Sequence, residues 1–376
     1  MMLGDWRRCW KGKRSDERAQ STHLTPSLSP REGGEGERSK ARAAHLLRSG
    51  EKAGDEVIAV SQFVENFLQA LVAGLLTGAI YGLMCVGLSV IFGVMRVINF
   101  AHGDFMMLGM YVAYYAFGVL GIHAVFGSTI GPYVAALIAG PVIFLVGILV
   151  HRLLISKVTG MRSSALRSEG HYAQLILTLG LALILQNGGL YLFGSTPVSI
   201  STPLASNAWA FGPLHGDRIE VFVNQGQTVA AIIAVVVVLA FVMVMNRSRL
   251  GKSLRAAADN PEAATYMGID VTQSHRLAFG FGVAITAIGG GLLASGTSFQ
   301  PYVGLEYVIV MYAGVVLGGL GSVSGAFLGG LTIGLVQQMS TLFLPNQLQN
   351  TAIFVVFLFI VLLRPQGLFG TALRRT

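Results

Sequence analysis

Long apolar stretches recur along the chain from Phe67 onward, separated by short polar clusters. They cover residues 67–95, 104–120, 132–151, 173–194, 227–245, 276–296, 307–320, 326–343 and 350–363. In a lipid bilayer only a helix satisfies every backbone N–H and C=O group inside such a segment, so we predict helices rather than strands. This includes the valine-rich run 234–239, because an open strand edge cannot face hydrocarbon. The expected fold is an all-α polytopic membrane protein, a bundle of about eight to nine transmembrane helices with two interrupted helices.

The first residues of the chain have a different composition. Residues 1–56 contain 12 of the Lys and Arg residues and 9 of the Asp and Glu residues, and they have no apolar segment long enough for a signal peptide. We expect residues 1–60 to be a disordered polar extension and residues 61–370 to form the membrane domain. A basic arm on the membrane surface, a solvated tail and a start codon assigned too far upstream remain open as interpretations of the extension.

The remaining basic residues indicate the orientation of the bundle. The loops 151–171 and 246–276 and the C-terminal end hold most of them, whereas the segment 195–225 has Arg218 as its only basic residue. Because Lys and Arg accumulate on the cytoplasmic side, we place 195–225 outside and the other three inside, with the turn at 321–325 also inside. The side of the N-terminus stays open, since a helix over 67–95 measures about 43 Å against a hydrocarbon core of about 30 Å and must tilt or break.

Two of the apolar runs are interrupted by polar or small residues. The first interruption is 99–104, and the second is the Gly/Ser-rich run 317–330. Paired broken helices in the two halves of a chain are typical of a transport pathway, in which freed helix ends meet a polar solute such as an amino-acid zwitterion. The candidate pathway residues are Asn99, His102, Gly103, Asp104, Gly321, Ser322, Ser324 and Gly325.

Each polar residue of the first interruption also has a purely structural interpretation. His102 is explained equally as a turn residue that bonds nearby carbonyls. Asp104 suits the N-cap of the helix that follows, which is the role we prefer, and Glu306 has the same explanation before a later run. The glycines spaced four apart, such as Gly74, Gly78 and Gly82, lie on one helix face and predict close helix packing in lipid, with helix movement as the alternative.

The loop after the 227–245 run has the punctuation of a short helix over 261–267. Asn260 suits the N-cap, Pro261 the first position, Glu262 the positive end of the dipole and Gly268 the left-handed residue after the end. So short a helix is unstable alone in water, so it needs a surface: its own bundle, lipid headgroups or a partner protein. The candidate docking residues are Arg255, Asp259, Asn260, Glu262, Ala263, Ala264 and Gly268.

Two sequences that resemble enzyme motifs do not meet the chemical requirements. The run 251–253 ends like a phosphate-binding loop, but Asn246 stands where the first glycine is required and an apolar run precedes it. Ser324 lies in a near match to the serine motif of intramembrane proteases, but the last histidine is His275, so no base follows it. Cys9 and Cys85 lie in unlike surroundings and indicate neither a disulfide nor a metal site. We therefore expect a transport subunit without a cofactor, metal or ATP site of its own.

The loop 255–269 resembles the coupling segment of ABC importer permeases, which insert a short helix into their ATPase subunit. Together with 99–104, 316–330 and 364–370, it resembles in order and spacing the LivH-type permeases of high-affinity branched-chain amino-acid transporters. The resemblance covers about residues 63–370 and leaves the N-terminal extension outside.

The resemblance implies an assembly in the bacterial inner membrane. Its other members would be two ATP-binding subunits, a LivM-like second permease subunit and a periplasmic substrate-binding protein, with no nucleic acid. Related permeases carry urea, short amides and other acids, so branched-chain amino acids are the expected cargo among several. The alternative is an ion-coupled secondary transporter or channel, which the paired interruptions also fit. Outside 99–104 the apolar runs lack the mid-span carboxylates that ion coupling typically uses.

Overall fold

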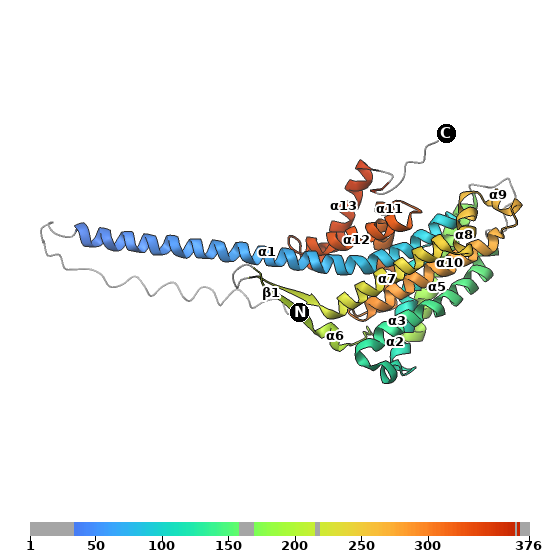
Figure 1. Cartoon of the computed structure of the whole chain (residues 1–376), viewed down its shortest axis with the longest axis horizontal. Helices are drawn as coiled ribbons and strands as arrows, with labels where there is room; N and C mark the ends of the chain where they lie inside the picture. The colour runs from blue at the N-terminus through green and yellow to red at the C-terminus, as the bar shows by residue number, and fades with distance from the viewer. Residues whose placement is uncertain (1–33, 158–168, 215–218, 365–366, 369–376) are drawn as a thin grey trace, which may run out of the picture. The chain divides into compact units, whose positions relative to one another are not determined.

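The computed structural model describes residues 34–157, 169–214, 219–364 and 367–368, and in them the predicted helices are present (Figure 1). The long helices are α1 (Gly34–Met95), α2 (His102–Gly118), α3 (Ile122–Val150), α5 (Glu169–Phe193), α7 (Gln225–Arg247), α10 (Val271–Ala294), α11 (Val303–Gly318), α12 (Val323–Ser340) and α13 (Gln349–Leu363). The short ones are the π-helix His151–Ile155, α6 (Pro203–Ser206), α8 (Arg249–Asp259), α9 (Pro261–Tyr266) and the 3-10 helix Asn346–Leu348. Each predicted apolar run coincides with one long helix, so the all-α fold is confirmed.

Five helical segments of the described chain are long and apolar enough to cross a membrane. They are Val60–Met95, Ile122–Ile155, Ala173–Phe193, Gln225–Arg247 and Val271–Ala294. Helices α11 and α13 are apolar but shorter. The number of crossings therefore stays a prediction.

Helix α1 begins earlier than the apolar pattern indicates. The chain divides into two units, 1–59 and 60–376, and in the first the backbone is helical from Gly34 onward. We expected no regular structure there, but Ala, Glu, Lys and Arg are good helix formers, and extending an existing helix costs far less than starting one. The part of the expected disorder that concerns residues 1–33 lies outside the described residues.

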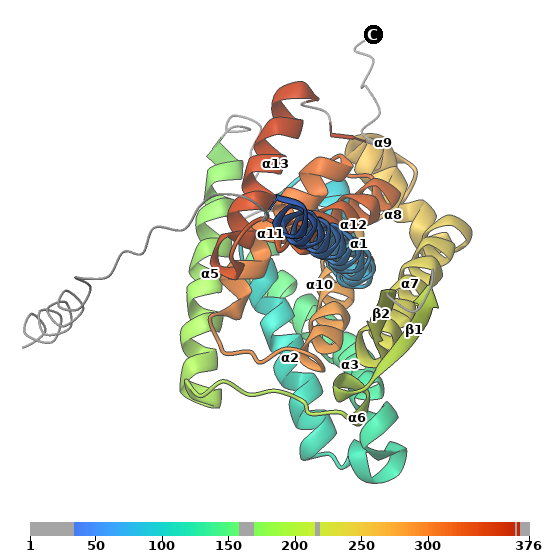
Figure 2. The ribbon, with the colours of Figure 1, turned by 90° about the vertical axis from the view of Figure 1, so that its left-hand side faces the viewer.

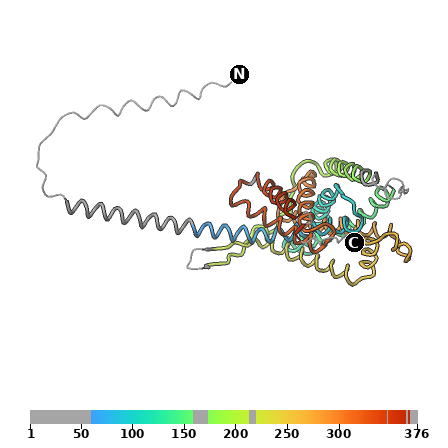
Figure 3. Tube along the Cα trace, turned by 90° about the horizontal axis from the view of Figure 1, so that it is seen from above, coloured from blue at the N-terminus to red at the C-terminus, as the bar shows by residue number. Residues whose placement is uncertain are grey.

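Helices α1 and α10 form the centre of the second unit. Their apolar segments are 83% buried, whereas those of α5 and α7 are only 22% and 28% buried. In views from two directions α5 and α7 lie on opposite sides of the bundle (Figures 2 and 3). The outer faces of α5 and α7 are thus left for lipid or for another subunit.

Close approach of glycines joins α1 to α12. A Cβ atom added to Gly78 would lie 2.7 Å from the carbonyl oxygen of Leu331, and one added to Gly74 would lie 3.0 Å from the Cα atom of Leu335. On the facing helix, a Cβ atom on Gly330 would lie 2.5 Å from the Cα atom of Gly82. The backbones therefore touch, which confirms helix packing as the role of this glycine series.

A β-hairpin covers part of the predicted outer loop. Strands β1 (Ala208–Leu214) and β2 (Ile219–Asn224) pair antiparallel, an element that the apolar pattern did not predict. Gln69 of α1 holds the hairpin: its Nε2 donates to the carbonyl of Phe222 at 2.8 Å, and the N–H of Phe222 donates back to Oε1 at 3.0 Å. At the other end of α1, Arg96 lines a cavity together with Arg255 of the predicted cytoplasmic loop. The predicted sides of these two segments therefore imply that helix α1 runs from the outer side to the cytoplasmic side.

This direction predicts which thiols a membrane-impermeant reagent reaches in intact cells. With Cys9 replaced by serine, Val60→Cys should react from outside, because this 64% exposed position lies beyond Gln69 on α1. Tyr266→Cys in α9, 89% exposed, should react only after the membrane is opened, in cells that express the chain without its partner subunits. Labelling of intact and of opened cells, followed by mass determination of the protein, measures both reactions. The reverse pattern would show that the chain has the opposite orientation in the membrane.

Candidate transport pathway and docking surface

The first interruption ties three helices together through His102. This side chain is fully buried at the start of α2, and its Nε2 lies 2.7 Å from Oγ1 of Thr286 in α10. The same hydroxyl lies 3.3 Å from the carbonyl oxygen of Met84 in α1. The backbone of the next residue, Gly103, lies close to α11. A Cβ atom added to Gly304 of α11 would lie 2.8 Å from the carbonyl oxygen of Gly103. His102 thus bonds a threonine hydroxyl, and Gly103 allows the close helix contact.

Asp104 is buried within the first turn of α2 and does not cap the helix. The N-cap residue is Ala101, and no side chain bonds the free N–H groups there. The predicted N-cap role of Asp104 is therefore wrong, and so is that of Glu306, because α11 begins after Tyr302 without a side-chain cap. Both helices start earlier than the apolar pattern indicates, so these carboxylates lie inside the first turn, where the positive end of the dipole favours them.

The carboxylate of Asp104 has an unsatisfied oxygen. Its Oδ1 has no hydrogen-bond partner among the described residues, although Gln186 of α5 lies near the carboxylate. A buried carboxylate with an open oxygen is costly in lipid unless water or a solute reaches it. This supports a place for Asp104 near the pathway.

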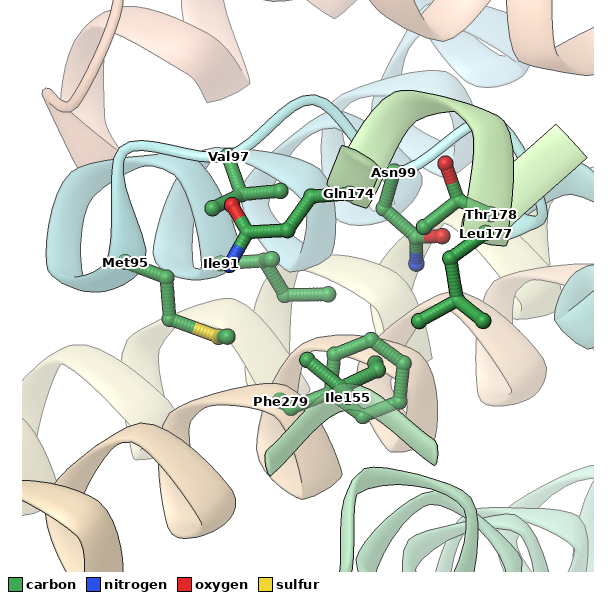
Figure 4. A pocket seen from close by; sticks show the side chains of 9 residues that line it. All are labelled: Ile91, Met95, Val97, Asn99, Ile155, Gln174, Leu177, Thr178 and Phe279. Carbon is green, nitrogen blue, oxygen red and sulfur yellow. The ribbon is translucent and has the colours of Figure 1, made fainter. Parts of the chain in front are cut away.

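Asn99 lines a small cavity below the interruption, shown in Figure 4. Its side chain is buried, and neither amide atom has a hydrogen-bond partner among the described residues. Gln174 and Thr178, one turn apart on α5, line the same cavity of about 10 Å³, which has room for about one water molecule. The sequence reasoning missed these α5 residues, although two buried polar residues four apart in an apolar run were a usable signal.

The second interruption forms a tight turn between α11 and α12. Gly319 and Gly321 have positive φ angles of 100° and 85°, which glycine adopts without strain. Ser322 is the N-cap of α12, since its Oγ accepts from the N–H of Gly325 at 3.2 Å, and it lies 3.5 Å from Oγ of Ser324. Gly321 lines a cavity of about 370 Å³ at the end of the bundle that is predicted to be cytoplasmic. Among the described residues, the second interruption therefore borders the larger cavity, whereas the cavity at the first interruption has room for about one water molecule.

Helix α9, in the loop that is predicted to be cytoplasmic, begins and ends with the predicted residues. Oδ1 of Asn260 accepts from the N–H of Ala263 at 3.0 Å, Pro261 opens the helix, and Gly268 follows its end with a φ of 79°. The N–H of Ile269 then donates to the carbonyl of Ala264 at 2.9 Å. Both ends of α9 are fixed by the chain itself, so its shape does not depend on a partner.

Six of the seven predicted docking residues are exposed, and Ala264 is the exception among them. Ala264 is 4% exposed and faces its own chain, whereas Tyr266 and Met267 are 89% and 82% exposed. Arg255 bonds Oδ1 of Asn246 at 3.3 Å and lines the cytoplasmic cavity. Sequence reasoning missed Tyr266 and Met267, although large apolar residues at the end of a short helix in a polar loop were a signal.

Comparison with known proteins places the chain in a family. Residues 70–363 match the model described as branched-chain amino acid transport system / permease component. The high-affinity branched-chain amino acid transport system permease protein LivH of Escherichia coli is 28% identical over 81% of this chain and 96% of its own length. BraD of Pseudomonas aeruginosa is 29% identical over 82% and 97%, and a probable LivH of Methanocaldococcus jannaschii is 28% identical over 70% and 78%. No solved structure matches. The chain belongs to the family of branched-chain amino acid transport system permease components.

Proposed function

We propose that this chain is the transmembrane permease subunit of an ATP-driven ABC importer, which carries branched-chain or related amino acids across the bacterial inner membrane. The single observation that carries the proposal is α9, a capped helix at the cytoplasmic end that exposes two large apolar side chains. Lone exposed apolar residues are common, but a preorganised helix that presents an aromatic side chain and a methionine is typical of a protein interface.

Helix α9 is the proposed contact to the ATP-binding subunits. Tyr266 and Met267 project from its end, and Ala263 is exposed on the preceding turn. Aromatic anchors in a partner's pocket carry much of the binding energy of an interface. On its inner side α9 packs through Ala264, and α8 connects it to the bundle. A movement of the ATPase is thus transmitted through α8 to α7 and α10, on which α8 packs.

The other partners fit the remaining surfaces. Helix α13 buries only Ile353 and exposes Phe354, Leu358 and Phe359, so a LivM-like second permease subunit has an apolar face to pack against. The periplasmic substrate-binding protein would meet the outer end, where the hairpin β1–β2 and the loop before it lie. ATP hydrolysis takes place on the separate ATP-binding chains.

The proposed pathway uses both interruptions. Asn99, His102 and Asp104 supply buried polar atoms within the bundle, and Gly321 borders the cytoplasmic cavity. A zwitterion is met there by amide, hydroxyl and helix-end groups.

One observation favours the alternative of an ion-coupled transporter. Asp104 is a buried intramembrane carboxylate with an unpartnered oxygen, the kind of group that binds protons or sodium in such proteins. Uptake of labelled leucine in reconstituted vesicles, driven by ATP and not by an ion gradient, is the experiment that separates the two.

A further inference from the structure

A cavity at the cytoplasmic end combines an apolar wall with charged groups of both signs. Its volume is about 370 Å³, within the range of small-molecule sites, which is about 300–1,000 Å³. Helices α1, α7, α8 and α12 enclose it. The apolar wall consists of Val90, Val94, Val242, Met245 and Val323.

The charged end of the cavity comes from two different elements. Arg96 lies just after α1, and Arg255 and Asp259 lie one turn apart on α8. A guanidinium binds a carboxylate through two parallel hydrogen bonds, and a carboxylate binds an ammonium group. Two cations and one anion around a single cavity therefore match the two ends of a zwitterion. A ligand that carries only a negative charge would be repelled by the carboxylate of Asp259.

Two further observations indicate that this end is built for a ligand. Ser89 lines the cavity and is buried to 1% exposure, yet its hydroxyl has no hydrogen-bond partner among the described residues. Arg96 has a φ of 53°, the one positive φ outside glycine among the described residues. Such backbone strain persists where the surrounding structure imposes it and is concentrated at binding sites and switches. The unsatisfied hydroxyl and the fixed arginine both lie at the same cavity.

We propose that this cavity binds a zwitterionic apolar amino acid from the cytoplasmic side, and that its occupancy slows the transport cycle. The inference rests on the proposed function. The ligand would join Arg96 of α1 to Arg255 and Asp259 of α8, and α8 continues through Asn260 directly into the docking helix α9. Bound amino acid thus restrains the element that must move with the ATPase, so accumulated product reduces further import.

The test uses the complete transporter in proteoliposomes with the ATP-binding subunits facing outward. Loaded binding protein and labelled leucine are enclosed, ATP is added outside, and labelled leucine that emerges is counted. Unlabelled leucine added outside reaches only the cytoplasmic face and should lower the rate. Isovalerate and isoamylamine, which keep the side chain but only one charge each, should not lower it.

Two variants of the cavity lining locate the effect. Arg96→Asn keeps a residue that tolerates the left-handed backbone but removes the guanidinium, and Val242→Phe fills the apolar end. The inhibition of each variant is measured relative to its own rate without added leucine. Both should raise the leucine concentration that halves the rate. For Arg96→Asn the expected change is about tenfold, the effect of losing one hydrogen bond to a charged group. For Val242→Phe the larger ring occupies the space of the leucine side chain. Arg247→Gln removes an exposed cation of the same end, outside the cavity lining, and should leave inhibition unchanged.

Three outcomes would overturn the inference. The first is ATP-driven transport that leucine on the cytoplasmic side does not slow. The second is inhibition that persists unchanged in both variants. The third is equal inhibition by isovalerate or inorganic phosphate, because the cavity would then be an anion site. A preparation that shows no ATP-driven transport even without added leucine would contradict the proposed function instead.

Discussion

Replacing Gly78 with leucine is expected to remove most of the folded protein from the membrane. The added Cβ alone would lie 2.7 Å from the carbonyl oxygen and 2.9 Å from the Cα atom of Leu331, and both are backbone atoms that cannot rotate away. Overpacking costs about 1–3 kcal/mol where side chains can adjust, and more where the backbone must move. A cost of about 3 kcal/mol lowers the ratio of folded to unfolded protein by about a hundredfold, a large part of the margin of a marginally stable protein.

Membrane abundance by immunoblot and monodispersity after detergent extraction measure this loss. Gly180→Leu is the matched control, because a Cβ there meets no atom within 4 Å on the weakly buried helix α5. Normal abundance of Gly78→Leu would show that α1 and α12 do not pack through this glycine face.

Removing the two exposed side chains of α9 is expected to separate the chain from its ATPase without unfolding it. Tyr266→Ala with Met267→Ala leaves the caps at Asn260 and Gly268 intact, so the helix keeps its shape. An anchor residue of an interface contributes about 2 kcal/mol or more, so ATPase binding should weaken by at least about 30-fold. Retention of the ATP-binding subunit by the purified, tagged chain measures the change.

The controls for the α9 variant test position and backbone separately. Tyr191→Ala removes a tyrosine of 90% exposure on α5 and should keep the ATPase bound. Gly268→Asn tolerates the left-handed conformation and should retain coupling, whereas Gly268→Val strains it by about 1–3 kcal/mol. Unchanged ATPase retention by the double variant would assign α9 to the bundle or to the lipid surface.

Much of the fold was predictable because the bilayer limits the choices. The valine run of α7 had to be helical in lipid, and the glycines of α1 had to bring backbones together. The hairpin β1–β2 was missed because it lies outside the apolar runs, where lipid imposes no pattern. Helix starts were also missed: the first turns before Asp104 and Glu306 are set by tertiary packing rather than by a capping side chain.

The site was only partly predictable because burial depends on residues distant in sequence. The caps of α9 followed from local sequence, since Asn260 and Gly268 act within a few residues of themselves. The burial of Ala264 did not follow from local sequence, because it depends on how α9 packs on the rest of the chain. The bond between His102 and Thr286 joins residues 184 positions apart, so no local pattern indicates it.

The central claim is that ATP hydrolysed on a partner chain drives amino-acid import through this protein. The most direct measurement is uptake of labelled leucine by vesicles that contain the complete complex, with ATP or with a non-hydrolysable analogue, and with ionophores that abolish proton and sodium gradients. We predict uptake that requires hydrolysis and the binding protein and is insensitive to the ionophores. Uptake that continues without ATP and stops with the ionophores would contradict this account and assign Asp104 to ion coupling.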